Sequence, residues 1–395
     1  MRRPRIAPEE ETLRLRFGII NEAPVSKGMS PSERYHEVLA EAIFAEEMGL
    51  DFYGLSEQHF VGTAYTISAP EVLFGALAVL TSKIKLRHMS VVALKFNHPI
   101  RIAERIATLD ILSRGRVEFG TARANNIHYL NAFGVDPAQT RSEWRETVEA
   151  SVRALTQSPF EFHGEHYDIA PVDVVPKPYH ATCPPLYVSA SSHESHRGVG
   201  ELGMGGMTFE SWLGWEHLEG CVKAYREGLA TAAPIAGLYE VNPAHALLTF
   251  PAHCAATREQ AIAEARSTVL GLFGQASQML LATARGEAAS GGSDYGYLRR
   301  LEDLEARKGD IEYLIEHSPS LLIGDPDQVT ERIKTYQSMG ISEIILKIDG
   351  YGHQANLRSI EMFGKYVIPE FRNSASVPKE NDWESVSVTV EKFQL

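Results

Sequence analysis

The sequence predicts an α/β fold, a (β/α)8 TIM barrel with insertions after strands 4, 5 and 7. Eight short apolar segments alternate with segments in which apolar residues recur at helical spacing. Residues 85–94 are mostly apolar on both faces, as a strand covered by helices requires. The chain of 395 residues is long for one compact domain but ordinary for a barrel.

The clearest single unit is residues 97–123, which we interpret as a helix followed by a strand. Pro99 suits the first turn of a helix, and Gly115 can end it in the left-handed conformation. The strand at 116–120 delivers Arg123 just beyond its C-terminal end, where barrels bind ligands, so Arg123 is a candidate anion clamp or a surface arginine. The apolar stripe of the helix comprises Ile102, Ile106, Leu109 and Leu112.

The remaining elements follow the same alternation along the chain. Strands are expected at residues 15–20, 51–55, 85–94, 116–120, 185–190, 205–208, 244–253 and 343–348. Ser32 is expected to cap a first helix at 33–48, and Ser191 to start the helix after the fifth strand. Further helices are expected at residues 70–81, 140–156, 215–229, 257–284, 326–339 and 354–366.

Three insertions interrupt the pattern: a loop at 124–139, a hairpin with a return loop at 159–185, and a lid at about 283–310. We expect residues 1–373 to form one barrel domain. The polar tail at 374–395 is expected to act as an arm against a partner subunit.

The composition excludes several classes of protein. A net charge of −13, from 38 basic and 51 acidic residues, argues against nucleic acid or an anionic membrane as the main partner. No apolar run reaches the roughly 20 residues that cross a bilayer, and the start lacks the apolar core of a signal peptide. We therefore expect a reduced, cytoplasmic protein.

The sequence predicts no metal site and no common nucleotide loop. The three cysteines, Cys183, Cys221 and Cys254, match neither a disulfide framework nor a zinc pattern. The pairs His163/His166 and His193/His196 lack a nearby acidic or cysteine partner set. Neither G-x-G-x-x-G after a strand, nor a Walker-type loop, nor G-x-S-x-G occurs.

Candidate chemistry lies where the predicted strands end. His59, in the loop after the second strand, is the leading acid–base candidate, with simple solvation as the alternative. Ser191 and Glu194 have capping-box spacing, and such a helix start also binds anions. Ser191, Ser192 and Arg123 could therefore hold one phosphate together. Trp212 and Trp215 could line a substrate pocket or pack between helices.

Several of these segments resemble the bacterial luciferase-like, flavin-dependent monooxygenase family. The matching segments are residues 46–60, 90–123, 131–137 and 324–346, and the second is long and specific among barrels. The resemblance implies a barrel that binds reduced FMN, which reacts with O2 to give a flavin C4a-hydroperoxide. It also implies a non-prolyl cis peptide at Ser90–Val91, under the flavin ring.

The resemblance assigns roles to individual residues. The family's Glu-His-His motif here reads Glu57-Gln58-His59, which makes His59 and Glu57 the expected catalytic pair. Ala122 stands where luciferase has a reactive cysteine, so light emission is not implied, and Ala124 and Tyr129 also depart from the family pattern. The expected cofactor-binding residues are Ser90, Val91, Asn97, Arg123, Ser189, Ser191 and Ser192.

We thus expect a two-component monooxygenase that oxygenates a small organic substrate. A separate flavin reductase would supply FMNH2, because no nicotinamide-binding motif is visible. A homodimer is expected from the resemblance alone. Two alternatives stay open: an F420-dependent hydride-transfer oxidoreductase on the same fold, and a non-catalytic flavin-binding barrel.

Overall fold

The structure, a computed structural model, describes residues 14–124, 127–210, 212–290 and 301–372. Within them, parallel strands close into the predicted barrel, because the last strand pairs with the first and β3 pairs with both β2 and β5. The barrel strands are β1 (Arg16–Asn21), β2 (Phe52–Leu55), β3 (Lys85–His88), β5 (Val117–Ala122), β8 (Leu186–Ala190), β9 (Gly205–Thr208), β10 (His245–Thr249) and β13 (Glu343–Lys347).

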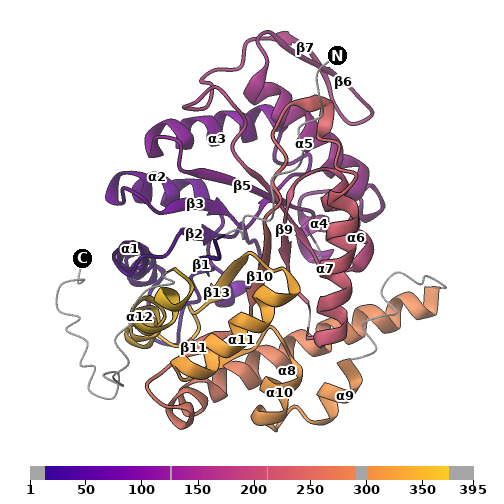
Figure 1. The fold of residues 1–395 in the computed structure, drawn as a ribbon. Coiled ribbons are helices and arrows are strands. Elements are labelled where there is room, and N and C mark those ends of the chain that lie inside the picture. Colours follow the sequence, from indigo (N-terminus) through magenta and orange to yellow (C-terminus); the bar gives the residue numbers. More distant parts are fainter. Residues whose placement is uncertain (1–13, 125–126, 211, 291–300, 373–395) are drawn as a thin grey trace, which may run out of the picture.

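Helices surround these strands on the outside (Figure 1). Three of them, α5, α7 and α11, have the predicted bounds. The surrounding helices are α1 (Pro31–Glu47), α2 (Pro70–Leu80), α3 (Pro99–Ser113), α5 (Thr140–Thr156), α6 (His193–Glu201), α7 (Trp215–Leu229), α8 (Arg258–Ser290), α11 (Pro326–Met339) and α12 (His353–Met362). None of the helices in the described ranges is both long enough and apolar enough to span a membrane.

The residues that end two helices differ from the predicted ones by one or two positions. Ser30, not Ser32, caps α1, because Ser30 accepts from the Glu33 amide and Glu33 in turn accepts from the Ser30 amide. At the end of α3 the left-handed conformation begins at Arg114, with φ of 58°, and continues at Gly115.

Two predicted strands are each broken into two pieces. The segment 85–94 divides into β3 and β4 (Val91–Val92), with a non-prolyl cis peptide at Met89–Ser90, one residue before the expected Ser90–Val91 bond. The segment 244–253 divides because Pro251 has no amide hydrogen for the ladder. After it, β11 (Ala252–Cys254) leaves the barrel and pairs with β12 (Leu322–Gly324).

The insertions are partly as predicted. The hairpin after α5 is confirmed as antiparallel β6 (Phe160–His163) and β7 (Asp168–Val172), at the periphery of the barrel (Figure 1). The expected loop at 124–139 instead contains α4 (Ile127–Ala132). The expected lid lies partly outside the described residues, as the tail at 374–395 does entirely. Beyond the gap come α9 (Leu301–Ala306) and α10 (Ile311–His317). Short helical turns cover Gly62–Ala64, Pro137–Gln139, Ile235–Gly237, Phe363–Val367 and Ile368–Phe371.

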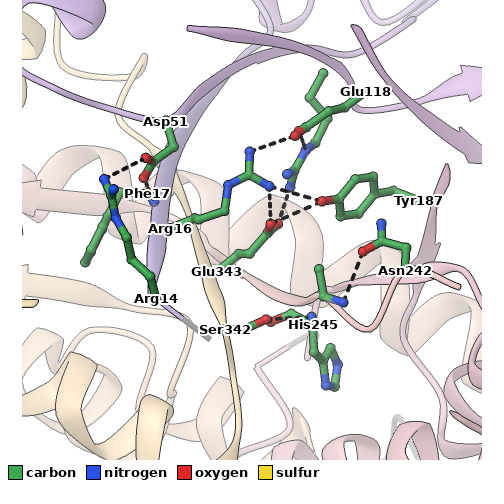
Figure 2. Close-up of polar contacts among 12 residues, drawn as sticks. Arg14, Arg16, Phe17, Asp51, Glu118, Tyr187, Asn242, His245, Ser342 and Glu343 are labelled. Carbon is green, nitrogen blue, oxygen red and sulfur yellow. Dashed lines mark hydrogen bonds and ion pairs between the residues drawn. The ribbon is translucent and has the colours of Figure 1, made fainter. Parts of the chain in front are cut away.

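A charge-balanced cluster fills the amino-terminal end of the barrel interior (Figure 2). Arg16 bonds Glu343 at 2.6 Å and Glu118 at 2.7 Å, and buried Arg87 bonds the same two carboxylates at 2.6 Å each. The Arg87 guanidinium also lies 3.9 Å from the centre of the Tyr187 ring. Burial alone would raise the pKa of Glu118, but the two arginines outweigh burial and lower it. This end is packed, so the carboxyl ends of the strands are the place to look for a site.

Candidate functional site

Glu57 and His59 meet at the carboxyl end of β2. The His59 Nε2 atom lies 3.1 Å from Glu57 Oε1. The buried Glu57 carboxylate also accepts from the Val92 amide at 3.0 Å and from the Asn97 side chain at 2.8 Å. Because a carboxylate accepts and does not donate, this contact assigns a proton to Nε2 of His59. Neutral His59 would then accept hydrogen bonds through Nδ1.

Asn97 is itself held from behind by helix α3. Arg105 donates to the Asn97 Oδ1 atom at 3.0 Å, and the Asn97 Nδ2 atom donates to the Val92 carbonyl at 3.0 Å. These two contacts fix which end of the amide faces Glu57. Asn97 therefore orients the catalytic candidates from the β4–α3 loop, rather than facing them as a lone polar group.

Aromatic side chains enclose the His59 ring. The ring centres of Tyr129 and Phe133 lie 4.9 and 5.1 Å from it, and Phe96 stacks on Phe133 at 4.3 Å. Phe60, at φ of 59°, is 66% exposed and borders the same group. Burial, with a smaller contribution from Glu57, raises the pKa of Tyr129 and keeps its hydroxyl neutral. Sequence reasoning missed this enclosure, because it depends on α4 folding over the strand ends.

Ser90 and Ser189 converge although they are 99 residues apart in the chain. Their hydroxyl oxygens are 3.0 Å apart. Ser189 is exposed although both neighbours in β8 are buried, so solvent reaches this part of the strand. Val91 behaves differently: its side chain is buried in the main hydrophobic core, which leaves only its backbone to face a ligand.

The predicted anion clamp comes from adjacent strands. β5 and β8 pair directly, with Thr121 opposite Val188, so Arg123 and the turn after Ala190 leave the barrel side by side. Arg123 is exposed. The two strand ends are therefore close together, as the phosphate hypothesis requires.

The cap of α6 differs from prediction. Ser192, not Ser191, is the N-cap, and it exchanges hydrogen bonds with Ser195 rather than with Glu194. Ser192 has extended backbone angles and Ser195 occupies the third helical position, which is the geometry a capping box requires. Ser191 lies just before the cap, and its carbonyl accepts from His217 at 2.9 Å.

A chain of hydrogen bonds between buried side chains supports this turn from inside the protein. His196 bonds the Ser192 carbonyl through Nδ1 at 2.7 Å and the Thr208 hydroxyl through Nε2 at 2.8 Å. Thr208 also contacts His245 Nε2 at 2.6 Å. Burial lowers the pKa of His196 to about 4, so the ring is neutral near pH 7. Since the carbonyl only accepts, Nδ1 carries the proton, Thr208 donates to His196 and His245 donates to Thr208.

A cluster of charged side chains at the ends of β1 and β13 was not predicted from the sequence either. Lys347 is buried and pairs with Asp349 and with Glu22, the latter at 3.0 Å. Burial alone would lower the pKa of Lys347, but these carboxylates outweigh burial and raise it. Gln58 donates to Glu22 at 2.9 Å, which links this group to the loop that carries His59.

The two tryptophans pack between elements. Trp212 is buried, and its indole donates to the Phe250 carbonyl at 3.1 Å. Trp215 stacks on Tyr336 with ring centres 5.8 Å apart. The packing interpretation is therefore the one that the contacts favour.

Comparisons with known proteins agree with this fold. The model of the luciferase-like monooxygenase family matches residues 15–343. The chain is 24% identical over 367 residues to the oxygenase component of a flavin-dependent trigonelline monooxygenase from Acinetobacter baylyi, covering 91% of this chain and 96% of that protein. It is 25% identical to limonene 1,2-monooxygenase from Rhodococcus erythropolis, covering 85% and 81%. An uncharacterised Sinorhizobium fredii protein aligns over only 53% of its own length, at 28% identity.

Solved structures share the fold at lower identity. The oxygenating constituent of a Pseudomonas putida 3,6-diketocamphane monooxygenase, in complex with FMN, has a TM-score of 0.73 at 21% identity and covers 90% of this chain and 99% of that one. An F420-dependent tetrahydromethanopterin reductase from Methanopyrus kandleri has a TM-score of 0.66 at 20% identity and covers 91% and 99%.

Proposed function

This chain belongs to the luciferase-like monooxygenase family, and on that basis we propose that it uses reduced FMN and O2 to oxygenate a small organic substrate. The observation that carries the proposal is convergence at one end of the barrel. The His59–Glu57 pair, the Ser90–Ser189 contact and the ends of β5 and β8 all lie at the carboxyl ends of the strands. A barrel of this kind places its chemistry at that end.

The donor set fits a flavin mononucleotide. Arg123 would pair with the terminal phosphate, and Ser191 and Ser192 would bring hydroxyls and the amino terminus of α6 to the same anion. Ser90, the Val91 backbone and Ser189 would line the ring system. Reduced FMN, when bound, supplies the electrons that activate O2.

His59 and Glu57 would manage protons beside the ring system. Glu57 holds the His59 Nε2–H group, which leaves Nδ1 to take or give a proton at the reacting atoms. Asn97 maintains this arrangement by donating to Glu57. The rings around His59 would exclude water from the reaction, a task that oxygen activation demands.

We further propose that a separate reductase supplies the reduced flavin. The experiment combines the purified chain with FMN, NADH and an unrelated flavin reductase, and follows 18O from 18O2 into a panel of small apolar compounds by mass spectrometry. We expect incorporation only when the reductase is present. NADH oxidation by the chain alone would contradict the two-component proposal.

A second experiment separates the alternatives. Anaerobic titration with reduced FMN and reduced F420 should show tighter binding of FMN. Preference for F420 would favour a hydride-transfer enzyme, because that cofactor transfers hydride without O2. Tight flavin binding with no substrate-dependent O2 uptake would favour a non-catalytic barrel.

We propose that the chain forms a homodimer through α2 and α3. These helices pack against each other and carry five of the ten large exposed apolar side chains among the described residues. Val72 and Val79 lie two turns apart on α2 and are 74% and 71% exposed. Leu112, which the stripe of α3 placed in the core, is 49% exposed beside Ile111. Exposed apolar side chains gathered on two packed helices are typical of an interface.

A further inference from the structure

Three side chains of the metal-binding type meet beside the turn between β8 and α6. His193 is the first residue of α6, and His217 and Cys221 lie on α7. One ligand atom from each lies within 4.8 Å of the other two. These partners of His193 could not be predicted from the sequence, because α7 begins more than 20 residues later along the chain. The cluster exists only through the packing of α6 on α7.

The packing of the two helices builds this cluster. His217 and Cys221 are four residues apart, so they share one face of α7. The His193 ring lies against His217, with ring centres 4.8 Å apart and an interplanar angle of 24°. Gly220 makes the approach possible, since a Cβ there would lie 2.4 Å from the His193 Nε2 atom.

The spacing of the Cys221 and His217 donor atoms matches tetrahedral zinc. Zinc–nitrogen and zinc–sulfur bond lengths put the two ligand atoms of such a site roughly 3.6 Å apart. The Cys221 Sγ atom is 3.5 Å from His217 Nε2. The Ser191 carbonyl oxygen, which accepts a hydrogen bond from the same nitrogen at 2.9 Å, lies 3.9 Å from Sγ, so an oxygen is also close to these ligand atoms.

We propose that His193, His217 and Cys221 bind a thiophilic divalent transition metal, Zn²⁺ by preference. Two imidazoles and one thiolate suit zinc and cobalt, whereas Ca²⁺ and Mg²⁺ require oxygen ligands. On binding, the thiol S–H bond breaks, the sulfur–metal bond forms and the proton passes to solvent. The imidazole of His217 donates the Nε2 lone pair, with its ring proton moved to Nδ1, and gives up its hydrogen bond to the Ser191 carbonyl. If His193 binds through Nε2, it likewise gives up the 3.2 Å contact with the His217 carbonyl.

The metal would act on the turn that precedes α6. Ser191 and Ser192 stand directly before His193, so a metal that joins His193 to His217 and Cys221 on α7 would hold this turn in place. We expect Zn²⁺ to raise the melting temperature of the protein and to increase the affinity of this turn for anions. Metal binding itself needs no flavin, so it can be tested whether or not the proposed function is correct.

The test uses Co²⁺ as a spectroscopic probe on the full chain without an affinity tag, after treatment with a chelator. We expect a thiolate-to-cobalt charge-transfer band in the near ultraviolet, lost when Zn²⁺ is added. Cys221→Ser should abolish the band. His193→Gln, at an exposed position, should weaken Co²⁺ binding by at least the roughly 10–100-fold that loss of a supporting ligand contact costs.

Cys183→Ser is the matched control, because this free cysteine lies outside the cluster, and it should leave the band unchanged. If Cys221→Ser fails to fold, the comparison of His193→Gln with the control still decides the question. Absence of the band in the wild-type chain, or an unchanged Co²⁺ affinity in His193→Gln, would overturn the proposal.

Discussion

The side-chain amide of Asn97 donates at 2.8 Å to the same Glu57 oxygen that contacts Nε2 of His59. One carboxylate oxygen thus joins the loop after β2 to the loop before α3. Arg105 completes the line by donating to Asn97 from the second turn of that helix. The orientation of His59 is therefore set by residues that follow it by about forty positions in the chain.

His59→Ala should slow the reoxidation of bound reduced FMN by O2, because it removes the group that we place beside the reacting atoms. General acid–base groups contribute about 10²–10⁴-fold, so the rate should fall within that range. Stopped-flow absorbance measures it without a known substrate. His36→Ala, at an exposed histidine on α1, is the control and should react like wild type.

Asn97→Ala should cause a smaller loss of the same rate, since His59 remains but its partner Glu57 loses a donor. The two substitutions should not add: Asn97→Ala should have little further effect in a His59→Ala background. Equal additional losses in both backgrounds would show that Asn97 acts independently of His59.

Val72→Asp combined with Val79→Asp should convert the dimer into a monomer, because both charges would be buried in the proposed α2–α3 interface. Sedimentation velocity measures the change. The matched control places the charge at Val175, which is 68% exposed but lies outside these helices, and should leave the dimer intact. A wild-type chain that sediments as a monomer would contradict the proposed homodimer.

Acid should destabilise the fold partly through Glu41. Burial alone would raise the pKa of Glu41, but Arg34, His353 and Asn356 lower it to about 2. A folded pKa below the unfolded value of 4.5 means that this contribution is complete above pH 4.5 and is lost as the pH falls toward 2. Denaturant unfolding across this range should show a shallower pH dependence for Glu41→Gln than for wild type. Equal slopes would show that another carboxylate dominates.

Most of the fold can be predicted from the sequence, because the patterns that mark its helices and strands are local. Asp325-Pro326 and Gly340 mark both ends of α11, and periodicity marks the helix between them. The predictions fail where a residue distant in the sequence determines the local structure. The ladder of β10 stops before Pro251, and the residues that follow pair with β12 instead. The sequence of β12 does not by itself predict a strand.

The candidate site was predictable only in outline. A polar or charged residue follows each of the predicted strands concerned, so His59, Arg123 and the serines could be found one by one. Their partners could not, because Phe133 reaches His59 through α4 and Cys221 reaches His193 through the packing of two helices. Such contacts follow from tertiary structure and leave no periodic signal in the sequence.

The central claim is that the ends of β5 and β8 hold the phosphate of a flavin mononucleotide. The most direct measurement compares the anaerobic affinities of reduced FMN and reduced riboflavin, which lacks the phosphate, for wild type and Arg123→Met. We predict that wild type binds FMN at least about tenfold more tightly, equal to about 1.4 kcal/mol, and that Arg123→Met removes most of this preference. Equal affinities for the two flavins, or a preference unchanged in Arg123→Met, would contradict the account.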